Sequence, residues 1–429
     1  MHHFSYKNGT LHAEDVALTK IAETVGTPFY CYARATIERH YTVFAEALGA
    51  QDPKRKRKVF YALKANSNLA VLRVLAKLGA GADTVSEGEV RRALAAGIPA
   101  NRIVFSGVGK SREELAYAVE AGIYQVNIET ESELELLSAV ASARGKRQAA
   151  VIRVNPDVGA GGHAKITTGS DANKFGVSLR EAERIYTRAA NMAGVSMVGL
   201  AVHIGSQIRQ LDELGAAFAR MAETTKRLRS EGHGVERIDC GGGLGIDYKQ
   251  APGQSDGPDL IHAYARLVDG TFGGLDVELG FEPGRLIVGN AGVLVTKALH
   301  HNPRPHTTFL VVDAAMNDLI RPAMYEAYHD IWPVKAPGPS AKAEPYDVVG
   351  PICESGDTFA VGRMLPPVAK DDLVAFMTAG AYGAVMSSTY NSRLLVPEVL
   401  VSGAEFAVVR PRLTFDELLG LDRVPAWLA

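Results

Sequence analysis

Four features that could take part in chemistry follow short apolar runs of this 429-residue sequence. Lys64 ends the run VFYALK, His203 follows MVGLAV, Gly241–Gly243 follow RIDC, and Glu282 ends LDVELGFE. Desolvation at an apolar strand end lowers the pKa of a lysine and favours an amine that can form a Schiff base. Successive glycines let backbone N–H groups converge on an anion, a carboxylate can keep a pyridine nitrogen protonated, and an imidazole can stack on a planar ring. Together the four features predict a site for a planar, phosphorylated cofactor.

Each of these features has an ordinary structural explanation when it stands alone. A lysine at a strand end usually extends its charged tip into water, glycines often form a tight turn, and a lone histidine near a strand end is usually structural. The sequence EPGR at 282–285 on its own is more typical of a surface turn with a local ion pair. The chemical interpretation rests on the coincidence that all four features come at the carboxyl ends of predicted strands.

The elements that would position these residues are eight apolar runs, most of them followed by a helical pattern. The runs are VFYALK (59–64), ADTVS (82–86), RIVFSG (102–107), YQVNIE (124–129), AAVIRVN (149–155), MVGLAVHIG (197–205), RIDCGGG (237–243) and LDVELGFEPG (275–284). Because these runs are nearly all apolar, they indicate parallel strands that are buried on both faces. Eight units over roughly 230 residues favour an α/β fold of the (β/α)₈ barrel type, with a doubly wound open sheet as the alternative. A barrel carries its chemistry at the carboxyl ends of its strands and often binds phosphate after strands 7 and 8.

After Gly289 the strands continue without intervening helical patterns, which predicts a β domain. The N-terminal segment contains a further strand, PFYCYA, which we expect to pair with this β domain rather than with the barrel. We therefore predict an N-terminal segment over 1–35, the barrel over 36–288 and the β domain over 289–429.

Composition narrows the class of protein. Lys and Arg number 46 and Asp and Glu number 48, so the net charge of −2 does not recruit nucleic acid or an anionic membrane. The basic run Lys54–Lys58 is more typical of a solvated loop than of a binding patch. Cys31, Cys240 and Cys353 form no CxxC pair, so we expect neither a disulfide framework nor a metal site. The sequence shows no signal peptide and no run of about 18–20 apolar residues, and a cytoplasmic protein without a membrane span is expected.

The ordered motifs resemble the fold-type III pyridoxal-phosphate decarboxylases that act on diaminopimelate, ornithine and arginine. The resemblance extends from about Phe29 to Phe406. It is carried by YALKAN around Lys64, HIGSQ at 203–207, GGGLG at 241–245, EPGR at 282–285, CESGD at 353–357 and AYG at 381–383. Six motifs in this order make the resemblance specific, and it covers nearly the whole chain.

This resemblance implies pyridoxal 5'-phosphate as the cofactor and a role for each matching residue. Lys64 would form the Schiff base, His203 would stack on the cofactor ring, Glu282 would pair with the pyridine nitrogen, and Asp83 would lie near the lysine. The phosphate would be bound by Ser206, Gly241, Gly242, Gly243, Gly284, Arg285 and Tyr382, with Pro283 in the same motif. Cys353 would be donated across a homodimer interface and would protonate the substrate carbon after CO₂ leaves, a task that suits a neutral thiol.

The substrate is indicated by MNDLIRPAMYEAYH at 316–329, which resembles the diaminopimelate branch of the family. Diaminopimelate ends in both a carboxylate and an ammonium, so its site needs an arginine together with an acid. The resemblance implies that Arg321 and Arg285 bind the distal carboxylate, that Glu354 binds the distal ammonium, and that Tyr325 and Tyr382 close the pocket. The expected reaction converts meso-2,6-diaminopimelate to L-lysine and CO₂, the last step of lysine biosynthesis from diaminopimelate.

Three alternatives remain at this point. One is decarboxylation of ornithine, arginine or a carboxylated polyamine, and another is alanine racemisation on a similar barrel. The Cys353 motif and the Arg321 segment argue against the racemase. The third is a non-catalytic relative, which we would expect to have lost the lysine, the glycines or the thiol, and all of these are present.

Overall fold

The computed structural model describes residues 2–158, 174–249 and 259–428. Contacts within this described chain divide it into two compact units. The barrel unit comprises Glu38–Ile246 and Gly257–Ile287, and the β unit comprises Met1–Ile37, Val288–Ala429 and a short segment that begins at Asp247. Among the helices of the described part, none is both long enough and apolar enough to cross a membrane.

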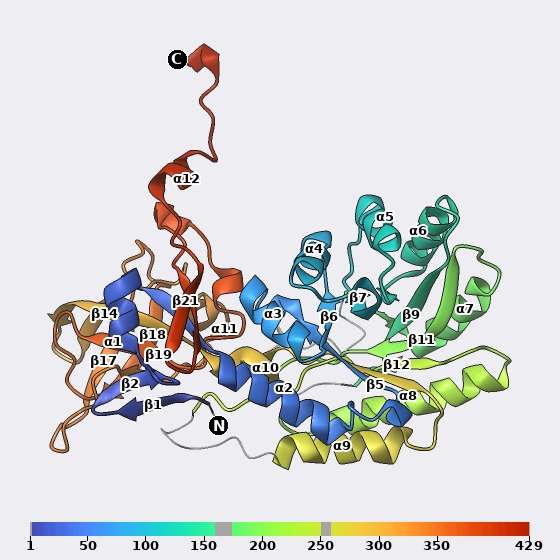
Figure 1. Cartoon of the computed structure of the whole chain (residues 1–429), viewed down its shortest axis with the longest axis horizontal. Coiled ribbons are helices and arrows are strands. Elements are labelled where there is room, and N and C mark those ends of the chain that lie inside the picture. The colour runs from blue at the N-terminus through green and yellow to red at the C-terminus, as the bar shows by residue number, and fades with distance from the viewer. Residues whose placement is uncertain (1, 159–173, 250–258, 429) are drawn as a thin grey trace. The chain divides into compact units, whose positions relative to one another are not determined.

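In the described part of the barrel unit, eight parallel strands close into a ring. Figure 1 shows strands of this unit together with the helices that lie outside them. The eight parallel strands are β5 (Arg57–Ala62), β6 (Gly81–Thr84), β7 (Ile103–Phe105), β8 (Gln125–Ile128), β9 (Gln148–Asn155), β11 (Val195–Val202), β12 (Arg237–Asp239) and β13 (Glu278–Phe281). Their hydrogen-bonded order is β9-β11-β12-β13-β5-β6-β7-β8, and the pairing of β8 with β9 closes the ring. A short strand, β10 (Val177–Ser178), pairs with β9. The closure confirms the predicted barrel and excludes the open sheet.

Helices alternate with the barrel strands, and five of the described helices of this unit begin at a polar side-chain cap. The helices are α2 (Arg34–Leu48), α3 (Leu69–Lys77), α4 (Glu87–Ala95), α5 (Arg112–Ala121), α6 (Glu131–Ser142), α7 (Leu179–Ala189), α8 (Asp212–Ser230), α9 (Asp259–Phe272) and α10 (Arg285–Val288). Ser111 begins α5 with a reciprocal capping box to Glu114, and Gly122 ends that helix in the left-handed conformation. Such local signals fix where each strand ends, and therefore where the residues at the barrel rim lie.

The β unit combines strands from both ends of the chain. Near the N-terminus, β4 (Phe29–Ala33) lies antiparallel to β14 (Gly292–Pro303) and parallel to β20 (Glu398–Ser402). The sheet order is β18-β17-β15-β14-β4-β20-β21, and β19 pairs with both β14 and β16. The remaining strands are β15 (Thr308–Val312), β16 (Ile331–Pro333), β17 (Glu344–Val349), β18 (Thr358–Leu365), β19 (Leu373–Phe376) and β21 (Glu405–Arg410). The expectation that the N-terminal strand joins the β domain is confirmed.

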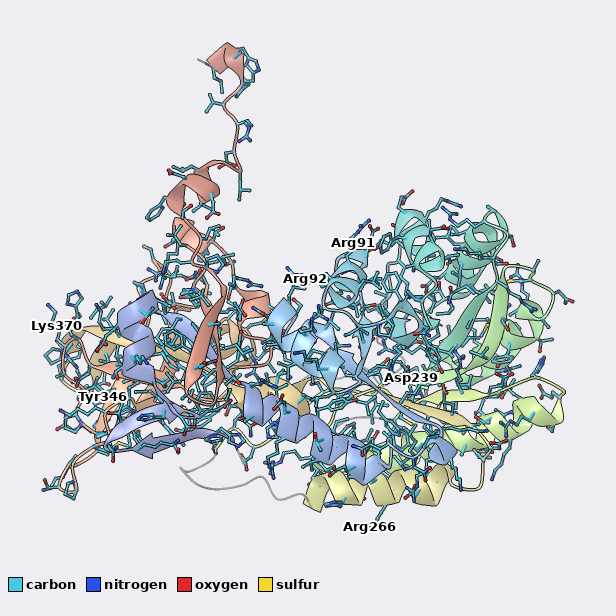
Figure 2. The ribbon with its side chains drawn as sticks, in the orientation of Figure 1. Arg91, Arg92, Asp239, Arg266, Tyr346 and Lys370 are labelled. Carbon is cyan, nitrogen blue, oxygen red and sulfur yellow. The ribbon has the colours of Figure 1, made fainter. Side chains whose placement is uncertain are left out.

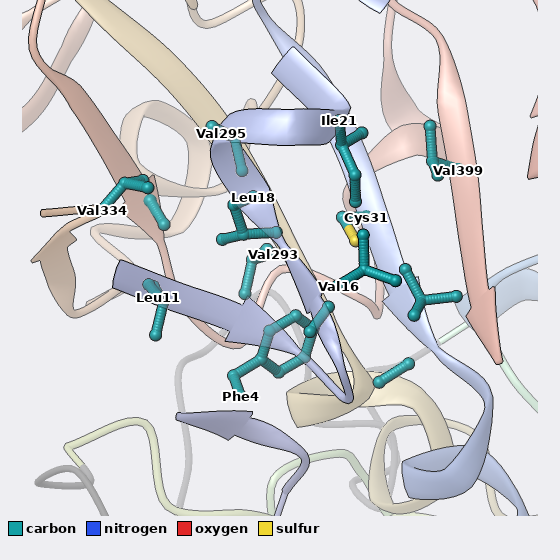
Figure 3. Packing of buried hydrophobic residues seen from close by; sticks show 14 of the residues in the cluster. Phe4, Leu11, Val16, Leu18, Ile21, Cys31, Val293, Val295, Val334 and Val399 are labelled. Atoms are coloured by element: carbon teal, nitrogen blue, oxygen red, sulfur yellow. The ribbon is translucent and has the colours of Figure 1, made fainter. Parts of the chain in front are cut away.

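A small N-terminal sheet completes the core of the β unit (Figure 3). It consists of β1 (Phe4–Lys7), β2 (Thr10–Ala13) and β3 (Val16–Ala17), and it is followed by α1 (Leu18–Val25). Figure 3 shows Phe4, Leu11 and Ile21 packed in one cluster with Val293 and Val399 of the later strands. The segments between the strands of this unit include the short helix α11 (Arg321–Tyr325). A further short helix, α12 (Phe415–Leu419), lies near the C-terminus.

Candidate active site

Lys64 lies in a tight turn (Leu63–Ala65) at the carboxyl end of β5. Its Nζ is 3.0 Å from Oδ2 of Asp83 on β6. The Asp83 side chain is fully buried, whereas the Lys64 side chain keeps 35% of its surface exposed. The amine therefore lies at the mouth of the barrel and is paired with a buried carboxylate.

A second acid, Glu89 of α4, lies beside this ion pair. Its carboxylate accepts a hydrogen bond from the backbone N–H of Val85 at 2.8 Å. Burial raises the pKa of Glu89 to about 7, with the Val85 N–H acting against this shift and the charge of Asp83 adding to it. Glu89 therefore holds its proton over a pH range in which an ordinary glutamate is ionised.

Two carboxyl groups, those of Asp239 and Glu282, hydrogen-bond to each other inside the barrel unit. Asp239 ends β12 and is labelled in Figure 2, and Glu282 directly follows β13. The Nδ2 of Asn127 is 3.2 Å from Oδ2 of Asp239 and 3.4 Å from Oε1 of Glu282, and the Gly241 N–H donates to Asp239 at 3.0 Å. Burial raises the pKa of both acids, and the charges of Asp239 and Asp83 raise that of Glu282 further, well above its ordinary value. The pair therefore holds a proton where two isolated acids would both be ionised.

His203 follows β11 with its ring held in one tautomer. Its Nδ1 is 3.2 Å from the backbone nitrogen of Gly242, so Nδ1 accepts this hydrogen bond and the ring proton resides on Nε2. Burial lowers the pKa of His203 well below 6.5, and the charges of Arg153 and Lys64 lower it further. A neutral ring of this kind suits stacking against a planar ligand better than an imidazolium that would have to be desolvated.

The glycine run after β12 is crowded on every side. A Cβ at Gly241 would clash with the backbone oxygen of Val202, and one at Gly242 would clash with that of Glu282. Gly241 also has a φ of +65°, in the left-handed region that favours glycine. Its N–H donates to Asp239 and that of Gly242 donates to His203, so two members of the run are committed to acceptors within the protein. The run therefore positions the acid pair and the histidine.

Ser206 and Arg285 form a polar pair at the same rim. The Nη2 of Arg285 donates to Oγ of Ser206 at 3.1 Å, and Arg285 is buried. Pro283 and Gly284, which precede Arg285, connect the end of β13 to the end of β5. The Ala62 N–H donates a hydrogen bond to the Pro283 oxygen at 3.1 Å. The two chains also approach closely at Gly284, where a Cβ would lie 3.1 Å from the Ala62 Cβ. A guanidinium with a neighbouring hydroxyl is a suitable donor set for phosphate.

The barrel residues fit pyridoxal 5'-phosphate on three observations. An amine stands at the mouth, a buried acid pair can face a ring nitrogen, and a serine–arginine pair can bind the phosphate. In addition, Oδ1 of Asp83 is buried and has no hydrogen-bond partner among the described residues, so the rim retains an acceptor for a ligand.

The other predicted residues belong to the β unit. Arg321 is the first residue of α11 and is buried, and its Nη1 lies 2.7 Å from Nε2 of His329. The guanidinium carbon of Arg321 is 4.8 Å from the ring centre of Tyr248. Tyr325 ends the same helix and is half-buried. The arginine is therefore fixed by its surroundings instead of extending freely from the surface.

Cys353 and Glu354 lie in an exposed turn that follows β17. The buried carboxylate of Asp357 holds this turn, because it accepts the N–H of Ile352 at 2.7 Å and that of Met316 at 2.6 Å. Since Met316 belongs to the segment that leads into α11, Asp357 ties the cysteine turn to the arginine segment. The two predicted substrate-binding segments of this unit are thereby held in one arrangement.

One further contact concerns the predicted acid Glu354, and one backbone angle concerns the predicted tyrosine Tyr382. The hydroxyl of Tyr390 hydrogen-bonds the carboxylate of Glu354, and this bond raises the pKa of Tyr390. Tyr382 is half-buried and has a φ of +56°, which is unusual for an aromatic residue. Backbone strain of this kind occurs mainly where the surrounding structure fixes a side chain for a function.

Four residues without a predicted role lie beside the predicted ones: Asp239, Glu89, His329 and Asp357. Asp239 precedes the glycine run, His329 and Asp357 lie inside motifs that were already notable for other residues, and Glu89 lies three residues after the run ADTVS. A usable signal was available for Asp239, because a charged residue within a buried strand must be paired or functional.

Comparison with known proteins identifies the family. Residues 34–289 match the family "Pyridoxal-dependent decarboxylase, pyridoxal binding domain". The chain is 46% identical over 425 residues to a diaminopimelate decarboxylase of Zymomonas mobilis, with 99% of both chains covered. It is 47% identical over 415 residues to the diaminopimelate decarboxylase of Pseudomonas aeruginosa, with 97% of both covered. The chain belongs to the diaminopimelate decarboxylase family.

A solved member of this decarboxylase family has the same fold over its whole length. The crystal structure of the diaminopimelate decarboxylase of M. jannaschii, in complex with L-lysine, matches this chain with a TM-score of 0.91 at 35% identity, and 99% of each chain is covered. The match to the pyridoxal binding domain includes every strand of the barrel. In this decarboxylase the barrel is therefore the cofactor-binding unit, and pyridoxal 5'-phosphate is the cofactor.

Proposed function

We propose that this chain decarboxylates meso-2,6-diaminopimelate to L-lysine and CO₂ with pyridoxal 5'-phosphate as cofactor. The observation that carries the proposal is the buried, held guanidinium of Arg321 in a chain whose barrel rim fits the cofactor. Ornithine and arginine end in cations, which a buried arginine would repel, whereas diaminopimelate ends in a carboxylate that an arginine binds. The names of the related enzymes support the same reaction.

The barrel residues are assigned to the cofactor. Lys64 holds it covalently, His203 lies against its ring, and Glu282 faces its pyridine nitrogen, with Asp239 sharing the proton. Its phosphate is bound by Ser206, Gly241, Gly242, Gly243, Pro283, Gly284, Arg285 and Tyr382, and Asp83 orients Lys64. When bound, the cofactor supplies a protonated ring that accepts the electron pair released as the bond between the substrate carbon and CO₂ breaks.

The substrate's remote end is assigned to the β unit and to Arg285. Arg321 and Arg285 bind the distal carboxylate, Glu354 binds the distal ammonium, and Tyr325 and Tyr382 close the pocket. The exposed thiol of Cys353 donates a proton to the carbon that has lost CO₂. We propose that Cys353 acts on the site of a second copy in a homodimer, that the domains are 1–35, 36–288 and 289–429, and that the enzyme works in the cytoplasm.

The test compares CO₂ release from diaminopimelate, ornithine, arginine and lysine by the purified holoenzyme. We expect diaminopimelate to be strongly preferred, and R321A to raise KM for it about 30-fold or more because a charged partner is lost. Arg304, an exposed arginine of the same unit, gives the control variant R304A, which should leave KM unchanged. An unchanged KM in R321A would overturn the substrate assignment.

A separate experiment tests the cofactor lysine. Borohydride reduction of the holoenzyme followed by peptide mapping should label Lys64. A label on any other lysine would contradict the assignment.

A further inference from the structure

Arg321 is held by a buried histidine that follows it by eight residues. The two side chains meet at 2.7 Å, from Nη1 of Arg321 to Nε2 of His329. Arg321 is 6% exposed and His329 is 2% exposed. Because a guanidinium has only N–H donors, it must be the donor in this bond, and Nε2 of the imidazole must be the acceptor.

The other ring nitrogen of His329 fixes this arrangement. Its Nδ1 is 2.9 Å from the backbone oxygen of Met377. A carbonyl oxygen can only accept, so Nδ1 carries the proton and Nε2 is left with a lone pair that points at Arg321. The backbone at both ends is anchored, since the Met377 N–H donates to the oxygen of Asp330 at 2.8 Å where β16 pairs with β19. The sheet therefore determines both the position and the tautomer of the histidine.

Tyr248 provides a third side of the same arrangement. Its ring centre lies 4.8 Å from the guanidinium carbon of Arg321 and 5.4 Å from the ring centre of His329, with the two rings nearly perpendicular at 83°. A guanidinium is attracted to the face of an aromatic ring. Neither the neutral imidazole nor the phenol ring carries negative charge, so both orient the cation without neutralising it. A carboxylate in the same position would orient Arg321 but would also compete with an anionic ligand.

We propose that His329 is a positioning residue for substrate specificity, which holds Arg321 in the orientation that binds the distal carboxylate. This inference rests on the proposed function, because it takes Arg321 as the carboxylate-binding residue. His329 acts only through Arg321 and contributes to binding of ligands that carry a carboxylate at that end. Ligands without this carboxylate are bound independently of His329.

The experiment measures calorimetric binding of two probes to the holoenzyme. L-Lysine keeps the distal carboxylate, and 1,5-diaminopentane is the same molecule without it. In H329L the acceptor is removed, and the Kd for lysine should rise about tenfold or more, because a hydrogen bond to a charged group is lost. The Kd for diaminopentane should change less than about twofold. In H329Q the side-chain amide oxygen can lie near the position that Nε2 of His329 occupies in the wild type, so this variant should recover part of the affinity for lysine.

A matched control is available in the same unit. His12 also has its Nδ1 at hydrogen-bond distance from a backbone carbonyl, that of Thr10 at 2.8 Å, but belongs to the N-terminal sheet. H12L should therefore leave the affinities for both probes unchanged. In turnover with diaminopimelate, H329L should raise KM and leave kcat within about threefold, since His329 acts through the arginine assigned to the end of the substrate that does not react.

The outcomes separate this inference from the proposed function. Equal weakening of both probes in H329L, or no weakening of lysine, overturns the positioning role. If H329L does not fold, the test uses H329Q and compares its ratio of Kd for lysine to Kd for diaminopentane with that of the wild type. An unchanged ratio overturns the inference. A wild-type enzyme that does not prefer lysine to diaminopentane would instead contradict the proposed function itself.

Discussion

Replacing Glu282 with glutamine should make the stability of the cofactor-free protein less sensitive to alkaline pH. Glu282 and Asp239 hydrogen-bond to each other, and burial raises the pKa of both. A carboxyl group with a raised pKa contributes its full stability below about pH 4, where it is protonated in the folded and the unfolded chain alike. That contribution is lost as the pH rises through the raised value. Glutamine does not ionise, so E282Q does not lose this contribution to stability as the pH rises.

The magnitude follows from the geometry of the pair. Two carboxylates about 3 Å apart repel each other by roughly 5 kcal/mol at an effective dielectric constant of about 20. The donors Asn127 and Gly241 and the charge of Lys64 offset part of this repulsion, so we expect a net loss of about 2–3 kcal/mol. An unfolding entropy of roughly 2.1 cal/mol/K per residue gives about 0.9 kcal/mol/K for 429 residues. Between pH 5 and pH 9 the wild type should therefore lose about 2–3 °C in Tm relative to E282Q.

Thermal unfolding of the cofactor-free wild type, E282Q and E278Q across this pH range is the assay. Glu278 lies on the same strand, but its carboxylate pairs with Lys58 at 2.8 Å, so E278Q should differ from the wild type by a nearly constant Tm. If the difference in Tm between E282Q and the wild type also stays constant from pH 5 to pH 9, the inference that Glu282 and Asp239 share a proton is wrong.

Two more predictions concern residues that hold the site. G242A should weaken binding of pyridoxal phosphate, measured by absorbance titration, and should cost about 1–3 kcal/mol of stability because its Cβ clashes with a backbone oxygen. The control is G199A on β11, whose added Cβ makes a similar clash with the neighbouring barrel strand. G199A should lower stability without changing cofactor affinity. Equal effects of G242A and G199A on cofactor affinity would contradict this distinction. D357A should lower kcat at unchanged cofactor affinity and cost about 1–3 kcal/mol, because two backbone N–H groups lose their acceptor. D347A, which removes the acceptor of one exposed N–H, should have little effect, and a kcat in D357A equal to that of D347A would refute the role of Asp357.

The barrel could be predicted from the sequence because each of its strands is a separate, nearly continuous apolar run. The β unit was harder to predict. β16 has only three residues, too few to show a period, and β18 is an edge strand in which Val361 is 77% exposed and Met364 is 57% exposed. A strand that buries only part of one face has neither the apolar run of a buried strand nor a strict alternation.

The same limit applies to the site. Lys64 and Glu282 are unusual residues for the ends of apolar strands, and Arg321 lies in a segment that the family resemblance marks. His329 is detected only through a partner that the fold brings near, since Met377 is 48 residues away from it. The position of Asp239 in a buried strand marks that residue as unusual, but its pairing with Glu282, 43 residues away, is seen only in the fold. No local pattern in a single sequence encodes such pairs.

Buried charges in this protein fall into two kinds, and the distinction bears on function. The guanidinium of Arg153 meets the carboxylate of Glu129 at 2.9 Å, and the two charges cancel within the barrel unit. Such a pair needs no ligand and is sufficient as a structural element. The acid pair of Glu282 and Asp239 instead shares a proton, and the partners identified for Arg321 orient it without adding a negative charge. These contacts do not themselves cancel the charge, which supports the roles proposed for the acid pair toward a pyridinium and for Arg321 toward a carboxylate. The kind of partner that a buried charge has, more than the extent of its burial, therefore separates the structural ion pair from the residues proposed to bind a ligand.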